Sequence, residues 1–145
     1  METDVLTSEQ NRKWNKNGYL VLRNVLSQQE IKNLTTVVDQ MYQEYLQQSE
    51  VKPNAEFDRR NVMEENDVFI PLMDHPVTFP IVLELMDPYI LLGMSEVIVR
   101  PPNPESSGIL HTDGGQAMRQ IRVSRYRLKS SIFSQTLRKK IKGIL

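Results

Sequence analysis

The fold of this chain is decided by the stretch NGYLVLRNVLSQQE, residues 17–30. Gly18 follows an asparagine and is a typical left-handed helix stop, so it predicts that a short helix ends there. The β-branched and apolar residues of 19–25 predict a largely buried strand. Ser27 and Glu30 match the capping box of a helix N-terminus, which predicts that a second helix begins at this point.

The flanking segments extend this pattern on both sides. On the N-terminal side, Thr7 or Ser8 is suited to cap the first helix, with Glu9 in its first turn. On the C-terminal side, apolar residues recur at three- and four-residue spacing, as an amphipathic helix requires. They are Ile31, Leu34, Val38, Met41, Tyr42, Tyr45 and Leu46. We expect this stripe to pack against the core rather than to form a ligand site.

Helices precede strands in the rest of the chain. Residues 49–67 are polar and predict a loop, whereas 74–76 (Asp-His-Pro) predict the start of a helix that 87–88 (Asp-Pro) ends. Strand character follows over 97–100 and again over 121–133, where apolar and basic residues alternate. This order predicts an α+β fold in which N-terminal helices pack on an antiparallel sheet or barrel.

The composition is that of a globular protein with restricted chemistry. With 145 residues, 39% of them hydrophobic and 25% charged, the chain has the size of one domain. It has no cysteine, which excludes disulfides, thiolate catalysis and zinc–cysteine sites. The N-terminus is polar and acidic, and no apolar run approaches the roughly 20 residues that a bilayer requires, so we expect a cytoplasmic protein. Any metal chemistry must use His75, His111 or carboxylates.

The charge is divided unevenly along the chain. Residues 114–145 hold 9 of the 18 basic side chains and none of the 18 acidic ones. Near the end of this segment Phe133, Leu137, Ile141 and Ile144 recur at helical spacing, which is typical of a basic amphipathic helix. Such a helix binds an anionic membrane or an acidic partner, and the alternative is a frayed tail. No nucleic-acid recognition motif accompanies the charge, so we expect no nucleic-acid partner.

One group of residues has chemical content: His111-Thr112-Asp113, followed by two glycines. Residues two apart on a strand point to the same face, so the imidazole of His111 and the carboxylate of Asp113 converge if this segment is extended. Such a pair is two-thirds of the 2-His-1-carboxylate triad that holds non-haem Fe(II). The alternative is a surface histidine beside a turn.

Several motifs together resemble the phytanoyl-CoA dioxygenase family of Fe(II)/2-oxoglutarate-dependent oxygenases. In chain order they are residues 17–27 as entry strand and helix cap, Asp74-His75-Pro76 as a helix start, Leu92-Gly93 before the strand 96–101, and His111-Thr112-Asp113-Gly114-Gly115 as the iron motif. The resemblance covers residues 14–133. It implies a double-stranded β-helix (a jelly roll) and a hydroxylase that uses O₂ on a small organic or acyl substrate.

The resemblance also implies that His111 and Asp113 are iron ligands and that 2-oxoglutarate is the co-substrate. The family takes its third ligand from a histidine well downstream, but this chain has no histidine after His111. Residues 97–145 hold about five strands at most, and a jelly roll needs about eight. We therefore expect an incomplete barrel and a truncated, inactive copy, in which 1–133 form the N-terminal part of the family domain and 134–145 a basic tail outside its pattern.

Basic residues are the candidates for binding the co-substrate carboxylate. Arg127 and Lys129 share a strand face with Arg125, and Arg100 lies on an earlier strand. The alternative is a solvated strand face. The pair Arg59-Arg60 offers a contact for an acidic substrate group, or belongs to an ordinary charged loop.

A second function remains open, namely a non-catalytic interaction module that uses the basic C-terminal segment on an anionic membrane or an acidic partner. Iron-dependent succinate production distinguishes the first function, and tail-dependent binding to anionic vesicles the second. In either case the open edges of strands 96–100 and 121–133 predict self-association.

Overall fold

The computed structural model describes residues 5–86 and 89–102, which are mixed helix and strand. The elements are α1 (Ser8–Asn17), α2 (Gln28–Leu46), β1 (Phe57–Arg60), α3 (Val62–Glu65), the 3₁₀ helix η1 (Asp67–Leu72), α4 (Phe79–Met86) and β2 (Glu96–Val99). The strand expected over 121–133 lies outside the described residues, so the incomplete jelly roll stays a prediction. Within the described residues no helix is both long and apolar enough to span a bilayer.

Helix α1 begins and ends where the sequence predicts. The Thr7 hydroxyl accepts a hydrogen bond from the Gln10 backbone N–H at 3.2 Å, and the Gln10 side chain accepts one from the Thr7 N–H at 2.8 Å. At the other end Gly18 has φ 75 and donates its N–H to the Trp14 carbonyl at 2.8 Å. A left-handed φ strains a residue that has a Cβ, so glycine suits this position.

The segment after α1 corrects a prediction. Residues 19–25 form no strand in the described structure, and Val21, near the middle of the segment, is 61% exposed rather than buried. Asn24 has φ 55, in the left-handed region, so the extended backbone is interrupted before Ser27. Apolar content was therefore misleading here, because a strand also needs a partner strand and an uninterrupted extended backbone.

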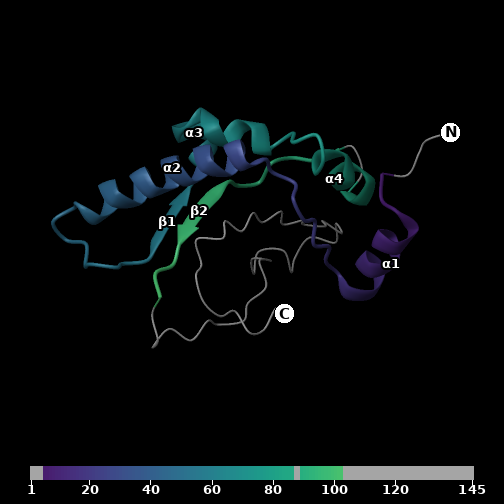
Figure 1. Cartoon of the computed structure of the whole chain (residues 1–145), viewed down its shortest axis with the longest axis horizontal. Coiled ribbons are helices and arrows are strands. Elements are labelled where there is room, and N and C mark those ends of the chain that lie inside the picture. Colours follow the sequence, from purple (N-terminus) through teal and green to yellow (C-terminus); the bar gives the residue numbers. More distant parts are fainter. Residues whose placement is uncertain (1–4, 87–88, 103–145) are drawn as a thin grey trace, which may run out of the picture.

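Helix α2 packs its apolar stripe on the sheet. Ser27 and Glu30 form the predicted capping box, and all seven stripe residues are partly buried. Tyr42 and Tyr45 contact Phe57 of β1, with ring centroids 6.2 and 5.2 Å apart. Figure 1 shows α2 beside the two strands, with α1 and α4 at the other end of the described region. The prediction that this stripe is a packing face is confirmed.

The two strands form an antiparallel ladder. Phe57 lies opposite Val99, Asp58 opposite Ile98, Arg59 opposite Val97 and Arg60 opposite Glu96. The strand predicted over 97–100 is confirmed in substance. The loop predicted over 49–67 is wrong, because this range contains β1 and α3.

Helix α4 begins later than predicted, at Phe79 rather than at Asp74. Residues 76–78 form a turn, in which the His75 carbonyl accepts the backbone N–H groups of Thr78 and Phe79 at 3.0 and 2.9 Å. The helix ends at Met86, immediately before the predicted Asp-Pro stop.

The side chain of Glu84 ties α4 to the N-terminal segment. One of its oxygens, Oε2, accepts the backbone N–H groups of Val5 and Leu6 at 2.7 and 2.9 Å. Leu6 is buried, and the other buried side chains of the described residues are Phe57, Val62, Phe69 and His75.

Candidate functional site

The residues predicted to hold iron and 2-oxoglutarate lie outside the described part of the chain. These are His111, Asp113, Arg127 and Lys129. The basic segment 134–145 lies outside it as well. Their roles therefore stay predictions. The described residues include the other histidine, His75, and two other candidate basic residues, Arg59 and Arg100, whose contacts are described below.

His75 is buried, with 6% of its surface exposed, and both ring nitrogens face protein atoms. Its Nδ1 accepts a hydrogen bond from the backbone N–H of Val77 at 3.3 Å. Its Nε2 lies 3.7 Å from the Glu30 carboxylate oxygen Oε1. In a neutral imidazole that accepts at Nδ1, the proton sits on Nε2 and points to the carboxylate.

This arrangement gives His75 a structural role. A metal ligand needs a nitrogen lone pair directed at open space, whereas the acceptor nitrogen of His75 is used by Val77 and the other nitrogen faces Glu30. The ring thus joins the turn before α4 to the first turn of α2. The sequence indicates a helix start at residues 74–76 and a histidine available for metal chemistry, but no local pattern indicates the contact with Glu30, because residues 30 and 75 are far apart in the chain.

The two carboxylate oxygens of Glu30 contact two different residues, Ser27 and His75. Its Oε2 accepts the Ser27 backbone N–H at 2.6 Å, while Oε1 faces His75. Hydrogen bonding to Ser27, through its side chain and its backbone, lowers the pKa of Glu30, and the nearby His75 adds to the effect. The carboxylate is therefore the form that fits this junction.

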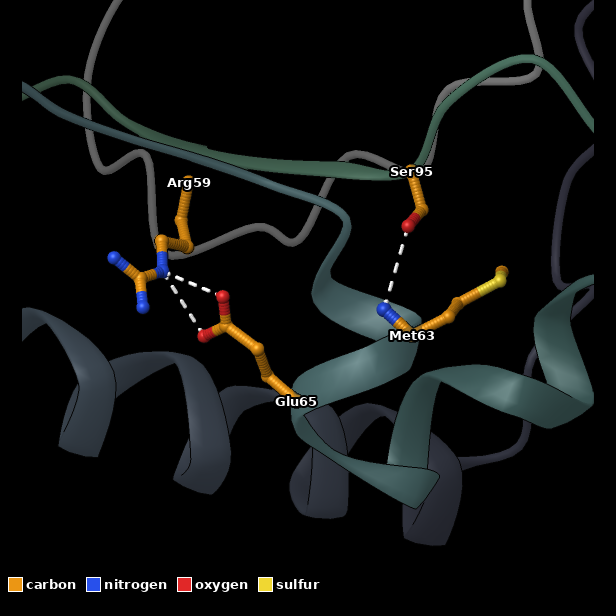
Figure 2. Close-up of polar contacts among 4 residues, drawn as sticks. All are labelled: Arg59, Met63, Glu65 and Ser95. Carbon is orange, nitrogen blue, oxygen red and sulfur yellow. Dashed lines mark hydrogen bonds and ion pairs between the residues drawn. The ribbon is translucent and has the colours of Figure 1, made fainter.

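Two of the predicted carboxylate-binding arginines already contact carboxylates of the chain itself. Figure 2 shows the Arg59 side chain directed at Glu65, with its Nε 2.7 and 2.9 Å from the two carboxylate oxygens. Arg100 Nε lies 2.8 Å from Glu56 Oε1, and this hydrogen bond raises the pKa of the guanidinium. Both pairs are exposed. For Arg59 the contact favours the ordinary charged segment over a substrate contact.

The ladder presents a second, charged face. Residues opposite each other in an antiparallel ladder share a face, so Asp58, Arg60, Glu96 and Ile98 lie on the side away from Phe57 and α2. Ile98 is 38% exposed there. The sequence pattern predicts a loop where β1 lies, so this face was not predicted. The signal available was Phe57, an aromatic residue within a polar stretch.

Figure 2 also shows how the end of this ladder is fixed. The Ser95 hydroxyl accepts the Met63 backbone N–H at 3.3 Å, and the Ser95 carbonyl accepts that of Asn61 at 2.6 Å. Asn61 has φ 59, which turns the chain from β1 into α3. Residues just before β2 thus hold the start of α3.

Metal-binding geometry is absent from this part of the protein: residues 5–86 and 89–102 contain no group of three or more histidine and acidic side chains arranged to hold an ion. No protein-family model matches the chain, and neither a curated protein nor a solved structure matches it. The family resemblance therefore rests on the motifs in the sequence.

Proposed function

We propose that this chain is an inactive copy that retains the iron-binding pair of a non-haem Fe(II)/2-oxoglutarate-dependent dioxygenase of the phytanoyl-CoA dioxygenase type, whose active members would act on a small organic or acyl compound. The observation that carries the proposal is the assignment of the two histidines. His75 is committed to Val77 and Glu30 within the folded core. Of the two histidines in the sequence, His111 is the one left as a metal ligand, and it belongs to the His-x-Asp motif.

The donor set fits the metal. A neutral imidazole from His111 and a carboxylate from Asp113 are ligands that Fe(II) accepts, and a site with few protein ligands keeps positions open for a co-substrate. Gly114 and Gly115 have no side chain that would keep a bound molecule away from the backbone. When bound, Fe(II) would supply the activation of O₂ that oxidation of a C–H bond requires.

The cationic side chains supply the second part of the proposal. Arg127 and Lys129 follow the metal motif in the sequence and are two residues apart, so they share a face if 121–133 is a strand. Their charges would hold the far carboxylate of 2-oxoglutarate and orient it. Arg59 and Arg100 are less suited to this role because their Nε atoms already bind Glu65 and Glu56.

Coupled binding of metal and co-substrate tests this function. Mn(II), which is stable in air, would be titrated into the metal-free protein with and without 2-oxoglutarate. Binding would be measured by calorimetry or by the loss of the electron paramagnetic resonance signal of free Mn(II). We expect 2-oxoglutarate to tighten Mn(II) binding, because two ligands that contact each other on one site stabilise each other's binding. Glutarate, which has the same five-carbon chain and two carboxylates but lacks the 2-oxo group, is the matched control and should tighten it less.

The variant Arg127→Gln/Lys129→Gln separates the two roles. We expect it to keep its affinity for Mn(II) alone and to lose the effect of 2-oxoglutarate. The matched control is Arg138→Gln/Lys139→Gln, which removes the same charge from the segment outside the family pattern and should behave like the unaltered chain. Metal binding that is indifferent to 2-oxoglutarate in the unaltered chain would refute the proposed function.

A further inference from the structure

The β1–β2 ladder has two edges. Within the described residues the sheet has two strands, so each strand has one neighbour. The Asn61 N–H bonds to the Ser95 carbonyl, and bonded pairs alternate along an antiparallel ladder. The pairs Arg59–Val97 and Phe57–Val99 therefore bond across the ladder, while the N–H and C=O of Ile98 point to the outer edge of β2.

The two faces of the ladder suit different side chains in an added third strand. On the α2 side β2 presents Val97 and Val99, which are half-buried near the ring of Phe57. On the other side it presents Glu96 and the exposed Ile98. A strand added to this edge therefore needs apolar residues on one parity, and on the other parity side chains that tolerate water and accept a nearby carboxylate.

Residues 125–129 have this pattern, whereas farther along the segment Ile121, Val123 and Phe133 share the basic parity and Arg122 shares the apolar one. Tyr126 and Leu128 lie on one parity, and Arg125, Arg127 and Lys129 lie on the other. An antiparallel register that sets Arg127 opposite Ile98 sets Tyr126 opposite Val99, Leu128 opposite Val97 and Lys129 opposite Glu96. Both apolar pairs then fall on the α2 side. On the other side Lys129 comes opposite Glu96 and Arg125 comes opposite Arg100, whose Nε is already bound to Glu56, while Arg127 comes opposite the uncharged Ile98.

Chain length and net charge also favour residues 121–133 as the strand that pairs with the outer edge of β2. Residues 100–120 connect β2 to this segment, which is ample for a return beside an antiparallel neighbour. Residues 1–102 hold 16 acidic and 9 basic side chains, whereas 103–145 hold 2 acidic and 9 basic ones. The outer edge of β1 is less suitable, because on the α2 side it presents Phe57 and the charged Arg59, which leaves one of the two added apolar residues opposite a guanidinium.

We propose that residues 121–133 of the same chain add to the outer edge of β2 as an antiparallel third strand, with Arg127 opposite Ile98. Two strands alone are marginal in water, and a third strand gives the sheet more apolar area beneath α2. The proposal does not depend on metal binding. Its failure would leave the iron assignment standing, and a failed metal titration would leave this pairing standing.

Disulfide trapping in the full chain tests the pairing, because the natural sequence has no cysteine. The variant Ile98→Cys/Arg127→Cys would be oxidised mildly, and its free thiols and molecular mass then measured. Neighbouring strands bring opposed Cα atoms about 5 Å apart, within disulfide range. We expect loss of both thiols in a monomeric product. The matched variant Asp58→Cys/Arg127→Cys places the first cysteine on the other strand and should keep its thiols.

The other outcomes overturn the proposal. Equal loss of thiols in the two variants would mean that the segment has no fixed position. A product linked between two chains would mean that the edge of β2 is taken by a second copy. Hydrogen exchange of the cysteine-free chain gives an independent check: the Ile98 amide should be protected, lose that protection in Leu128→Asp and keep it in Leu137→Asp. Rapid exchange of Ile98 in the unaltered chain would also overturn the proposal.

Discussion

His75 Nε2 lies 3.7 Å from Glu30 Oε1, and this contact joins the start of α2 to the turn before α4. The same carboxylate caps α2 by accepting the Ser27 N–H. One acidic side chain therefore holds a helix start and a buried imidazole together. This contact keeps His75 within the core and gives His111 the metal-binding role in the proposed function.

Removing the imidazole should destabilise the fold without affecting metal binding. His75→Ala deletes a buried ring and leaves the Val77 N–H without its acceptor. We expect a loss of about 0.5–3 kcal/mol in the free energy of unfolding, the usual range for a substitution that removes buried packing. Denaturant unfolding checks this value. Mn(II) affinity should stay unchanged under conditions in which the variant is folded, and a lost metal site would mean that His75 is a ligand.

Acid should weaken the junction through Glu30. Because its pKa is lowered from the ordinary value of 4.5 in the folded chain, its contribution to stability is fully present above pH 4.5. That contribution is lost as the pH falls through the lower, folded-state pKa. The difference in unfolding free energy between the unaltered chain and Glu30→Gln should be constant above pH 4.5 and shrink below it. A difference that grows in acid would contradict the lowered pKa.

The aromatic contact between α2 and β1 should be a major source of stability. Phe57 is buried and meets the rings of Tyr42 and Tyr45. Phe57→Ala should cost about 3–5 kcal/mol, as for other buried aromatic residues. Val21→Ala, at a position that is 61% exposed, should change stability by about 0.5 kcal/mol or less. Similar losses in the two variants would place the core elsewhere.

The N-terminal segment should depend on Glu84. Glu84→Gln removes the charge from the carboxylate that accepts the Val5 and Leu6 amides, and bonds to charged acceptors are the stronger ones. We expect faster hydrogen exchange at the Leu6 amide, with the Glu30–His75 junction unaffected. Glu50→Gln, which changes an exposed carboxylate after α2, is the control. Unchanged exchange in Glu84→Gln would show that burial of Leu6 alone fixes the segment.

Local motifs were predictable from the sequence and long-range pairings were not. The caps at Thr7, Gly18 and Ser27 were found because each cap involves residues within one helical turn. Strand β1 was missed because it depends on pairing with β2, and Phe57 meets Val99 far along the chain. For the opposite reason the strand predicted over 19–25 is wrong: its residues favour extended structure, but Asn24 turns the backbone.

The candidate site divides in the same way. The His111-Thr112-Asp113 spacing is local and was found in the sequence. The structural role of His75 became evident only from the structure, because the contact with Glu30 brings two distant segments together. The pairing of Arg59 with Glu65 likewise depends on the turn at Asn61, which no local pattern indicated.

Metal affinity of the single variants His111→Ala and Asp113→Ala tests the central claim most directly. Each would be titrated with Mn(II) beside the unaltered chain and beside Asp39→Asn, which removes an exposed carboxylate of α2. Even the loss of a group that supports a ligand weakens metal binding about 10–100-fold. We therefore expect at least this loss in both site variants and none in Asp39→Asn. If the His111→Ala variant binds Mn(II) as tightly as the unaltered chain does, the assignment of His111 and Asp113 as the iron pair is contradicted.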